Sequence, residues 1–160
     1  MVKQFYSADT YESSISMGYL LRRGRNLVTA QVEKVFAEKL ADQDITFVQW
    51  VILMCLRDDL ARTPSEICQY ICYDSGALTR VVDQMEERGL LTRKRSTEDR
   101  RVVELTLTPD GTAMIAKLIA LVVDCYNGMF ESFSQAEADT LLRLLTKFVD
   151  GLPDAPKKGS

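Results

Sequence analysis

Six cations stand close together between positions 88 and 101. They are Arg88, Arg93, Lys94, Arg95, Arg100 and Arg101. Only two anions, Glu98 and Asp99, lie among them, so the segment carries a local net charge of +4. Guanidinium groups at this density can bind phosphate, because arginine grips a phosphate oxygen pair with two parallel hydrogen bonds. The alternative is a solvated hairpin of mixed charge, and charge alone does not separate the two interpretations.

These cations follow a pattern of helix, tight turn, helix and two short strands over residues 65–108. Thr63 is the expected N-cap of the first helix, and Glu66 closes a capping box with it. Asp74 is the expected N-cap of the second helix, and Gly89 ends that helix in a left-handed conformation. This order predicts a winged helix-turn-helix, which places its second helix in the DNA major groove.

Apolar residues recur at the spacing that these elements require. The second helix has one apolar face, made by Leu78, Val81, Val82 and Met85. The first helix is expected to bury Ile67, Tyr70 and Ile71. The two strands are expected at about 90–95 and 102–107, and the second alternates apolar and polar residues.

Long apolar helices flank this unit on both sides. The expected helices cover about 13–41, 47–56, 108–130 and 134–150, and three of them begin at the caps Thr46, Thr108 and Ser134. The helix after the strands is apolar around much of its circumference and should be covered on both sides. A two-fold dimer would bury this surplus apolar surface. The alternative is that the outer helices wrap one monomeric core.

The predicted fold class is therefore mainly α with a small two-stranded antiparallel β-wing. A winged helix-turn-helix domain is joined to long N- and C-terminal dimerisation helices. The predicted division has an N-terminal dimerisation helix (1–44), a winged helix-turn-helix DNA-binding domain (45–111), C-terminal dimerisation helices (112–152) and a disordered tail (153–160).

Composition narrows the class of protein further. The chain of 160 residues is 46% hydrophobic and has a net charge of −3, as expected of an ordinary globular protein. No apolar run approaches the roughly 20 residues that span a bilayer, and no signal sequence is recognised. We therefore expect a soluble, cytoplasmic protein without a membrane partner.

Catalytic and metal-binding patterns are missing from the sequence. The chain has no histidine, and its four cysteines form no C-x-x-C pair. There is also no phosphate-binding loop and no nucleophile elbow. We expect no enzymatic activity, no metal and no cofactor.

Four segments together resemble the MarR family of transcriptional regulators. Residues 45–53, ITFVQWVIL, resemble the family's LTxxQWxVL helix, and residues 78–90 resemble its recognition helix. Residues 99–101 match the D-x-R of the wing, and residues 107–111 match the LTxxG that follows it. The resemblance implies a homodimeric repressor or activator that binds a double-stranded, pseudo-palindromic operator. Many members are released by a small aromatic or phenolic ligand, and others sense oxidants through cysteine. Of these we expect a repressor that is released by such a ligand.

The resemblance also assigns DNA contacts residue by residue. In the recognition helix these fall on Asp74, Ser75, Ala77, Thr79 and Arg80. Arg80 is the best candidate for a strong contact with guanine or phosphate. In the wing, Arg101 would enter the minor groove with Asp99 bracing it, and phosphate contacts would come from Arg93, Arg95 and Arg100. Gly76 and Ala77 replace two polar residues common in the family, which predicts reduced base readout.

Effector control remains open between three hypotheses. Tyr19, Trp50, Met54 and Tyr70 are candidates to line a ligand cleft, with simple core packing as the alternative. A redox switch would use Cys68 and Cys72, which are four residues apart and hence on one helix face. Their alternative role is also packing. Finally, the winged helix could serve protein–protein contacts instead of DNA.

Overall fold

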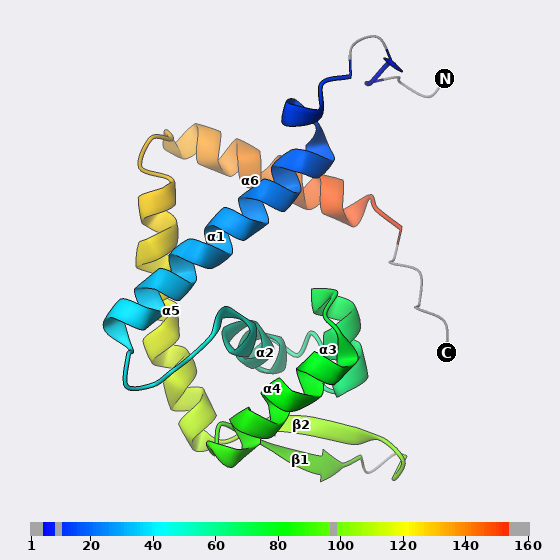
Figure 1. The fold of residues 1–160 in the computed structure, drawn as a ribbon, viewed down its shortest axis with the longest axis vertical. Helices are drawn as coiled ribbons and strands as arrows, with labels where there is room; N and C mark the ends of the chain where they lie inside the picture. Colours follow the sequence, from blue (N-terminus) through cyan, green and yellow to red (C-terminus); the bar gives the residue numbers. More distant parts are fainter. Residues whose placement is uncertain (1–4, 9–10, 97–98, 154–160) are drawn as a thin grey trace.

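The computed structural model describes residues 5–8, 11–96 and 99–153, and it is mainly helical (Figure 1). Its elements are η2 (Ser13–Ile15), α1 (Met17–Lys39), α2 (Phe47–Arg57), α3 (Pro64–Ile71), α4 (Ser75–Glu87), β1 (Leu91–Arg95), β2 (Val103–Leu107), α5 (Pro109–Met129) and α6 (Gln135–Asp150). The two strands form one antiparallel sheet. The predicted fold class is confirmed. Except for Pro153, the predicted disordered tail lies outside the described residues.

The elements fall into two groups in space. α2, α3, α4 and the hairpin form one group, which we call the winged-helix unit (Figure 1). α1, the far half of α5 and α6 form the other group, which we call the outer helices. α5 joins the two groups, because it starts directly after β2 and runs away from the hairpin to α6 (Figure 1).

One continuous core holds the winged-helix unit together. Its fully buried side chains include Ile52, Leu53, Ile67, Leu78, Val82, Met85 and Leu91. Val32 and Phe36 of α1 and Leu118 of α5 belong to the same cluster. The core therefore extends past the predicted boundaries at 44 and 112, and the division into three structural parts stays a prediction.

Local capping fixes where the helices begin. Reciprocal capping boxes are present at Thr46, Thr63 and Ser134, each closed by the side chain three residues later. The carboxylate of Asp74 accepts the N–H of Ala77 at the start of α4. These side chains satisfy amide hydrogens that have no partner within the helix, so the sequence determines the starts locally.

The hairpin is fixed to the rest of the unit at its base. Leu91 lies opposite Leu107, and Arg95 lies opposite Val103. The N–H of Leu105 donates to the carbonyl of Arg62 (2.7 Å), which ties β2 to the residue before the α3 N-cap. Gly89 has a φ of 69°, as predicted for the residue that ends α4.

The burial of apolar side chains on α3, α5 and α6 differs from what the sequence predicted. Tyr70 is 57% exposed, because α3 has only eight residues and Ile67 alone is buried on it. α5 buries one side only, and Val123 and Tyr126 on its far half are exposed. α6 has no buried residue. The expected cover on both sides of α5 is therefore not supplied by the described residues of one chain.

The length of α5 bears on the expectation that no apolar segment is long enough to span a bilayer. Among the described residues, α5 is the one helix long and apolar enough to cross a membrane by length and composition alone. The core helix of a soluble protein passes the same test. Met114, Ile115 and Leu118 of α5 lie in the core, so packing against the winged-helix unit accounts for part of this apolar character.

Candidate nucleic-acid interface

Four of the predicted contact residues lie at the N-terminal end of α4. They are Asp74, Ser75, Ala77 and Thr79. The Asp74 carboxylate accepts the Ala77 N–H at 2.9 Å, so this side chain caps the helix. The Thr79 hydroxyl donates to the Ser75 carbonyl at 2.9 Å, which keeps it on the helix surface. Ser75 and Thr79 are exposed, while Ala77 is half-buried. The Ser75 hydroxyl can accept or donate a hydrogen bond to DNA, whereas the Thr79 hydroxyl, whose hydrogen is already used, can accept one.

Arg80 lies one residue further along α4 and is exposed. It forms no ion pair with any other residue that the structure describes. An unpaired guanidinium keeps its five donors for a partner outside the chain. This position therefore suits the strong contact predicted from the sequence.

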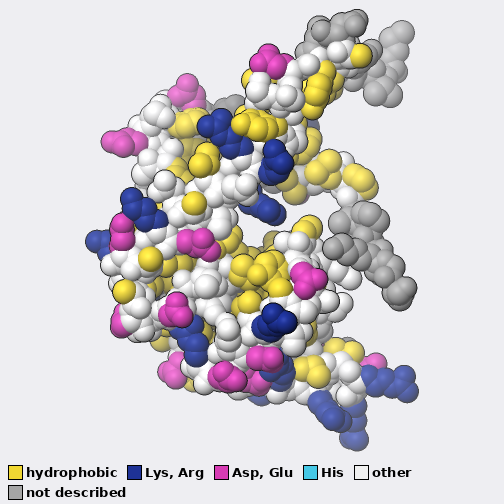
Figure 2. Space-filling view, viewed as in Figure 1, with side chains coloured by type: hydrophobic (Ala, Val, Ile, Leu, Met, Phe, Trp, Pro, Cys, Tyr) yellow, Lys and Arg dark blue, Asp and Glu magenta, His cyan; other side chains and the backbone are white. Residues whose placement is uncertain are grey.

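The far end of the hairpin carries a second group of free cations. Arg95, Arg100 and Arg101 are exposed and make no ion pair within the described part of the chain. Lysine and arginine side chains gather at this end of the molecule (Figure 2). With Arg80 they make four cations on two elements, which we call the free-cation set.

Asp99 braces Arg101 through its backbone. Its carboxylate accepts the backbone N–H of Arg101 at 2.9 Å, and its carbonyl accepts the N–H of Val102 at 2.9 Å. The Arg101 guanidinium pairs with neither this carboxylate nor any other in the described ranges. Asp99 thus shapes the backbone turn and leaves the Arg101 side chain available.

Arg93 and Arg88 do not belong to the free-cation set. Arg93 forms ion pairs with Asp83 and Glu86 of α4. Arg93 holds the pKa of Glu86 below its usual range, first through the hydrogen bond from its backbone N–H and then through the bond from its guanidinium. The Arg93 guanidinium, for which the sequence predicted a phosphate contact, is therefore paired with two carboxylates of its own chain.

Arg88 closes the other end of α4. Its guanidinium donates to the carbonyl of Asp44 (3.0 Å), to the carbonyl of Gln43, and to the Gln49 side chain (3.4 Å). It anchors the end of α4 on the loop between α1 and α2. Its partners lie about 40 residues away in the sequence, and no local pattern identifies them.

The four candidate ligand residues are not gathered in one hollow. Tyr19 lines an open hollow of about 520 Å³ with Tyr6, Tyr11 and Arg22. The other three candidates are absent from its lining, which consists of residues near the start of α1. Trp50 is 7% exposed and packs in the core, whereas Tyr70 is largely exposed. Met54 is half-buried against the core.

The two cysteines of the proposed redox pair lie on α3 and at its C-terminal end. All four cysteines are free thiols. Cys72 ends α3 with a φ of 52°, so it lies outside the regular helix that carries Cys68. Burial and then the charge of Asp74 raise the pKa of the Cys68 thiol. A raised pKa lowers the thiolate fraction, which makes Cys68 less reactive.

The fold and this site define a winged-helix protein of the nucleic-acid-binding class. The family model for "MarR family" matches residues 45–103. An organic hydroperoxide resistance transcriptional regulator of Bacillus subtilis is 35% identical over 89 residues, which are 56% of this chain and 60% of that protein.

Solved structures extend the similarity over most of the chain. A Cys-to-Ser variant of MarR from E. coli, complexed with operator DNA, is 30% identical with a TM-score of 0.66, covering 83% of this chain and 94% of that chain. BpsR of Bordetella bronchiseptica, whose DNA binding is regulated by 6-hydroxynicotinic acid, is 28% identical with a TM-score of 0.74, covering 89% and 99%.

The chain belongs to the MarR family, and it is a transcriptional regulator with a DNA-binding winged helix. The relatives found are regulators and not enzymes. The motifs over residues 45–111 thus identified the family correctly.

Proposed function

We propose that this chain is a homodimeric repressor that binds a pseudo-palindromic operator through α4 and the wing. The observation that carries the proposal is the free-cation set. Arg80 stands on the exposed side of α4, and Arg95, Arg100 and Arg101 stand at the wing, all without an ion pair to another described residue. Cations on a helix and on an adjoining hairpin can contact one groove and its flanking phosphates together.

The outer helices support the homodimer. Leu141, Leu142 and Leu144 of α6 are 37%, 54% and 50% exposed. Val123 and Tyr126 of α5 and Leu20 and Leu21 of α1 are also exposed. Exposed apolar side chains on three helices are expected of an interface, and a two-fold axis would use the same surface of each chain. Two copies would also present two α4 helices to two half-sites.

Release by a small aromatic or phenolic acid completes the proposal. In BpsR, a structural neighbour, 6-hydroxynicotinic acid regulates DNA binding, and this compound is a small aromatic acid. Location in the cytoplasm, where the operator would be, follows from the same function. Among the four candidates, Tyr19 is favoured as a ligand contact because it lines the open hollow beside the start of α1.

The experiment is fluorescence anisotropy on the DNA upstream of the chain's own gene, over a salt series, with and without a panel of aromatic acids. Arg101→Ala should weaken binding to the operator and reduce the slope of log K against log salt by about 1. Lys34→Ala is the matched control, because Lys34 is an exposed cation on α1, paired with Glu38. Unchanged affinity in Arg101→Ala would contradict the wing assignment.

A redox-controlled regulator is the second candidate. Two observations favour it: the exposure of Cys72 at the turn between α3 and α4, and the hydroperoxide resistance function of the B. subtilis relative. The raised pKa of Cys68 opposes it. Peroxide should release DNA from the wild type but not from Cys68→Ser plus Cys72→Ser. Equal release from both proteins would exclude this pair as the sensor.

A further inference from the structure

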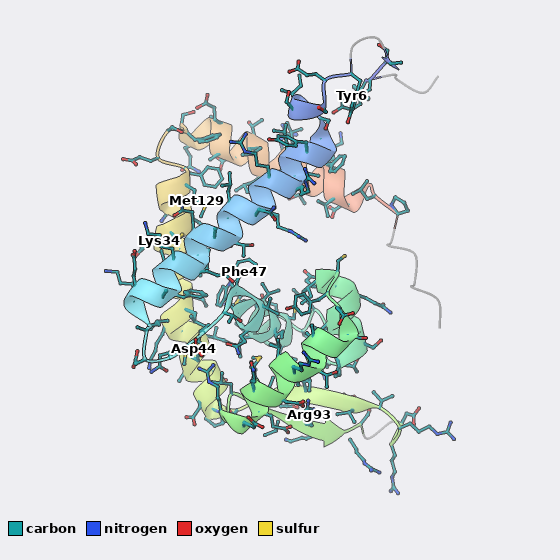
Figure 3. All side chains as sticks on the ribbon, viewed as in Figure 1. Tyr6, Lys34, Asp44, Phe47, Arg93 and Met129 are labelled. Atoms are coloured by element: carbon teal, nitrogen blue, oxygen red, sulfur yellow. The ribbon has the colours of Figure 1, made fainter. Side chains whose placement is uncertain are left out.

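One residue ties the wing to the recognition helix. Arg93 lies in β1, opposite Leu105 of β2, and its side chain lies between the hairpin and α4 (Figure 3). One terminal nitrogen of its guanidinium pairs with Asp83, and the other pairs with Glu86. The backbone N–H of Arg93 also donates to the second oxygen of Glu86 at 3.0 Å. Strand and helix are thus joined by three charge-assisted hydrogen bonds from a single residue.

This arrangement does not suit a phosphate contact. Asp83 and Glu86 are three residues apart on α4, so both face the same strand. Together they balance the charge of Arg93 and leave a net negative charge beside a surface that must approach DNA. The Arg93 side chain is 29% exposed, whereas Arg95, Arg100 and Arg101 are exposed and have no ion pair within the described ranges. Contact with a phosphate would require Arg93 to leave two carboxylates.

We propose that Arg93 is a positioning residue that holds the wing in a fixed relation to α4. The inference rests on the proposed DNA binding. A wing fixed in this way is already ordered when the chain folds, so Arg80 and the wing arginines can engage DNA together without a further loss of conformational entropy. Asp83 and Glu86 are the partners of Arg93 in this connection, although both are anions at a DNA-binding surface. We call these three residues the clamp.

The test is a mutant cycle in the full-length chain. The variants are Arg93→Met, Asp83→Asn plus Glu86→Gln, and the triple combination, with DNA affinity measured by anisotropy. Positioning predicts that Arg93→Met weakens binding about tenfold in the wild-type background but less than about twofold once both carboxylates are neutral. A direct phosphate contact predicts at least the same loss in both backgrounds. That second outcome would overturn the proposal.

Two further measurements keep the result interpretable. Thermal unfolding of each variant shows whether the fold is intact. Hydrogen exchange without DNA reports the clamp alone: amides of β1 should exchange about tenfold faster in Asp83→Asn plus Glu86→Gln, while those of α2 stay unchanged. Unchanged exchange in β1 would overturn the clamp, whether or not the chain binds DNA. Failure of the wild type to bind any DNA, with the clamp present, would instead count against the proposed function.

Discussion

The winged-helix unit and the outer helices differ in how much of their apolar surface one chain covers. α2 buries five of its residues, including Ile52 and Leu53, which are fully buried. α6 buries none, although leucines recur along its length. The first group is a finished core. In the second, Val32 and Phe36 of α1 are buried, but α6 and the far half of α5 present apolar side chains without cover from the described residues. The proposed two-fold dimer accounts for this difference, because a partner chain would cover that surface.

α5 shows that the difference arises from packing and not from composition. Its first half buries Met114, Ile115 and Leu118 against the winged-helix unit. Its second half exposes Val123 and Tyr126, although both halves are apolar. The same helix is therefore covered where it meets the core and uncovered where it leaves it. The space-filling view shows hydrophobic side chains at the surface beside the outer helices (Figure 2).

The largest expected effect comes from a charge placed on α6. Leu142→Glu should raise the dissociation constant of the dimer by about a hundredfold or more, because an unpaired carboxylate buried at an interface costs about 3–5 kcal/mol. Sedimentation equilibrium measures the shift, and DNA affinity should fall with it. Leu60→Glu is the matched control, since Leu60 is 50% exposed on the loop after α2. A variant Leu142→Glu that sediments like the wild type would show that α6 is not at the interface.

Replacing Gly111 by alanine tests how tightly α5 packs against the winged-helix unit. A Cβ there would lie 1.9 Å from the carbonyl oxygen of Leu90, whose backbone has no room to move because it accepts the N–H of Thr108. Gly111→Ala should lower the free energy of unfolding by about 3 kcal/mol, as overpacking does. Chemical denaturation measures it.

Gly24→Ala provides the contrast in the outer helices. A Cβ at Gly24 would meet nothing within 4 Å, so the change should stabilise α1 by up to about 1 kcal/mol. Destabilisation by Gly24→Ala would show that another chain approaches this position closely. Tolerance of Gly111→Ala would refute the tight junction between the hairpin base and α5.

Capping carboxylates give the two regions a pH-dependent comparison. Glu66 accepts the N–H groups of Arg62 and Thr63, both at 2.9 Å, and these bonds lower its pKa below the ordinary value of 4.5. Because the pKa is lowered in the folded chain, the stabilisation is complete above about pH 4.5. It is lost as the pH falls through the folded-state pKa.

Glu66→Gln should therefore destabilise the fold by about 1 kcal/mol at neutral pH and flatten its loss of stability below about pH 4.5. Urea unfolding at several pH values measures both effects. Glu137→Gln removes the charge from the corresponding capping box of α6, and it should loosen only that helix in hydrogen exchange. Equal global destabilisation by the two variants would contradict the contrast between the regions.

The smallest effect is expected at the turn between α3 and α4. Cys72 has a φ of 52°, which costs an L-residue about 1–2 kcal/mol, and glycine would recover part of this. Cys72→Gly should raise the melting temperature by about 1–2 °C, while Cys72→Ala should leave it nearly unchanged. Calorimetry measures the melting temperatures of the two variants. A lower melting temperature for the glycine variant than for the alanine variant would rule out strain at this turn.

The elements that the sequence predicted correctly are those set by neighbouring residues. The caps at Thr46, Thr63, Asp74 and Ser134 act within three positions of themselves, so their pattern is readable without tertiary structure. The left-handed Gly89 is equally local. The order of these signals predicted the winged helix, and the resemblance of four segments within residues 45–111 identified the family.

The sequence did not distinguish the arginines that form ion pairs from those that form none. Arg93 and Arg95 are near neighbours of equal charge, yet Arg93 faces Asp83 and Glu86 while Arg95 faces solvent. The partners of a strand residue depend on how the strand packs against α4. Burial of Tyr70 was wrong for a similar reason, because a short helix covers only one apolar position. Both outcomes depend on tertiary partners.

The most direct test of this account is the stoichiometry of the wild-type chain on DNA. Sedimentation of a saturated complex with the duplex upstream of its gene should give two chains per duplex, with affinity that falls steeply as salt rises. That result would place two recognition helices on one operator through the outer helices. One chain per duplex, or binding no tighter than to a random duplex, would contradict the account.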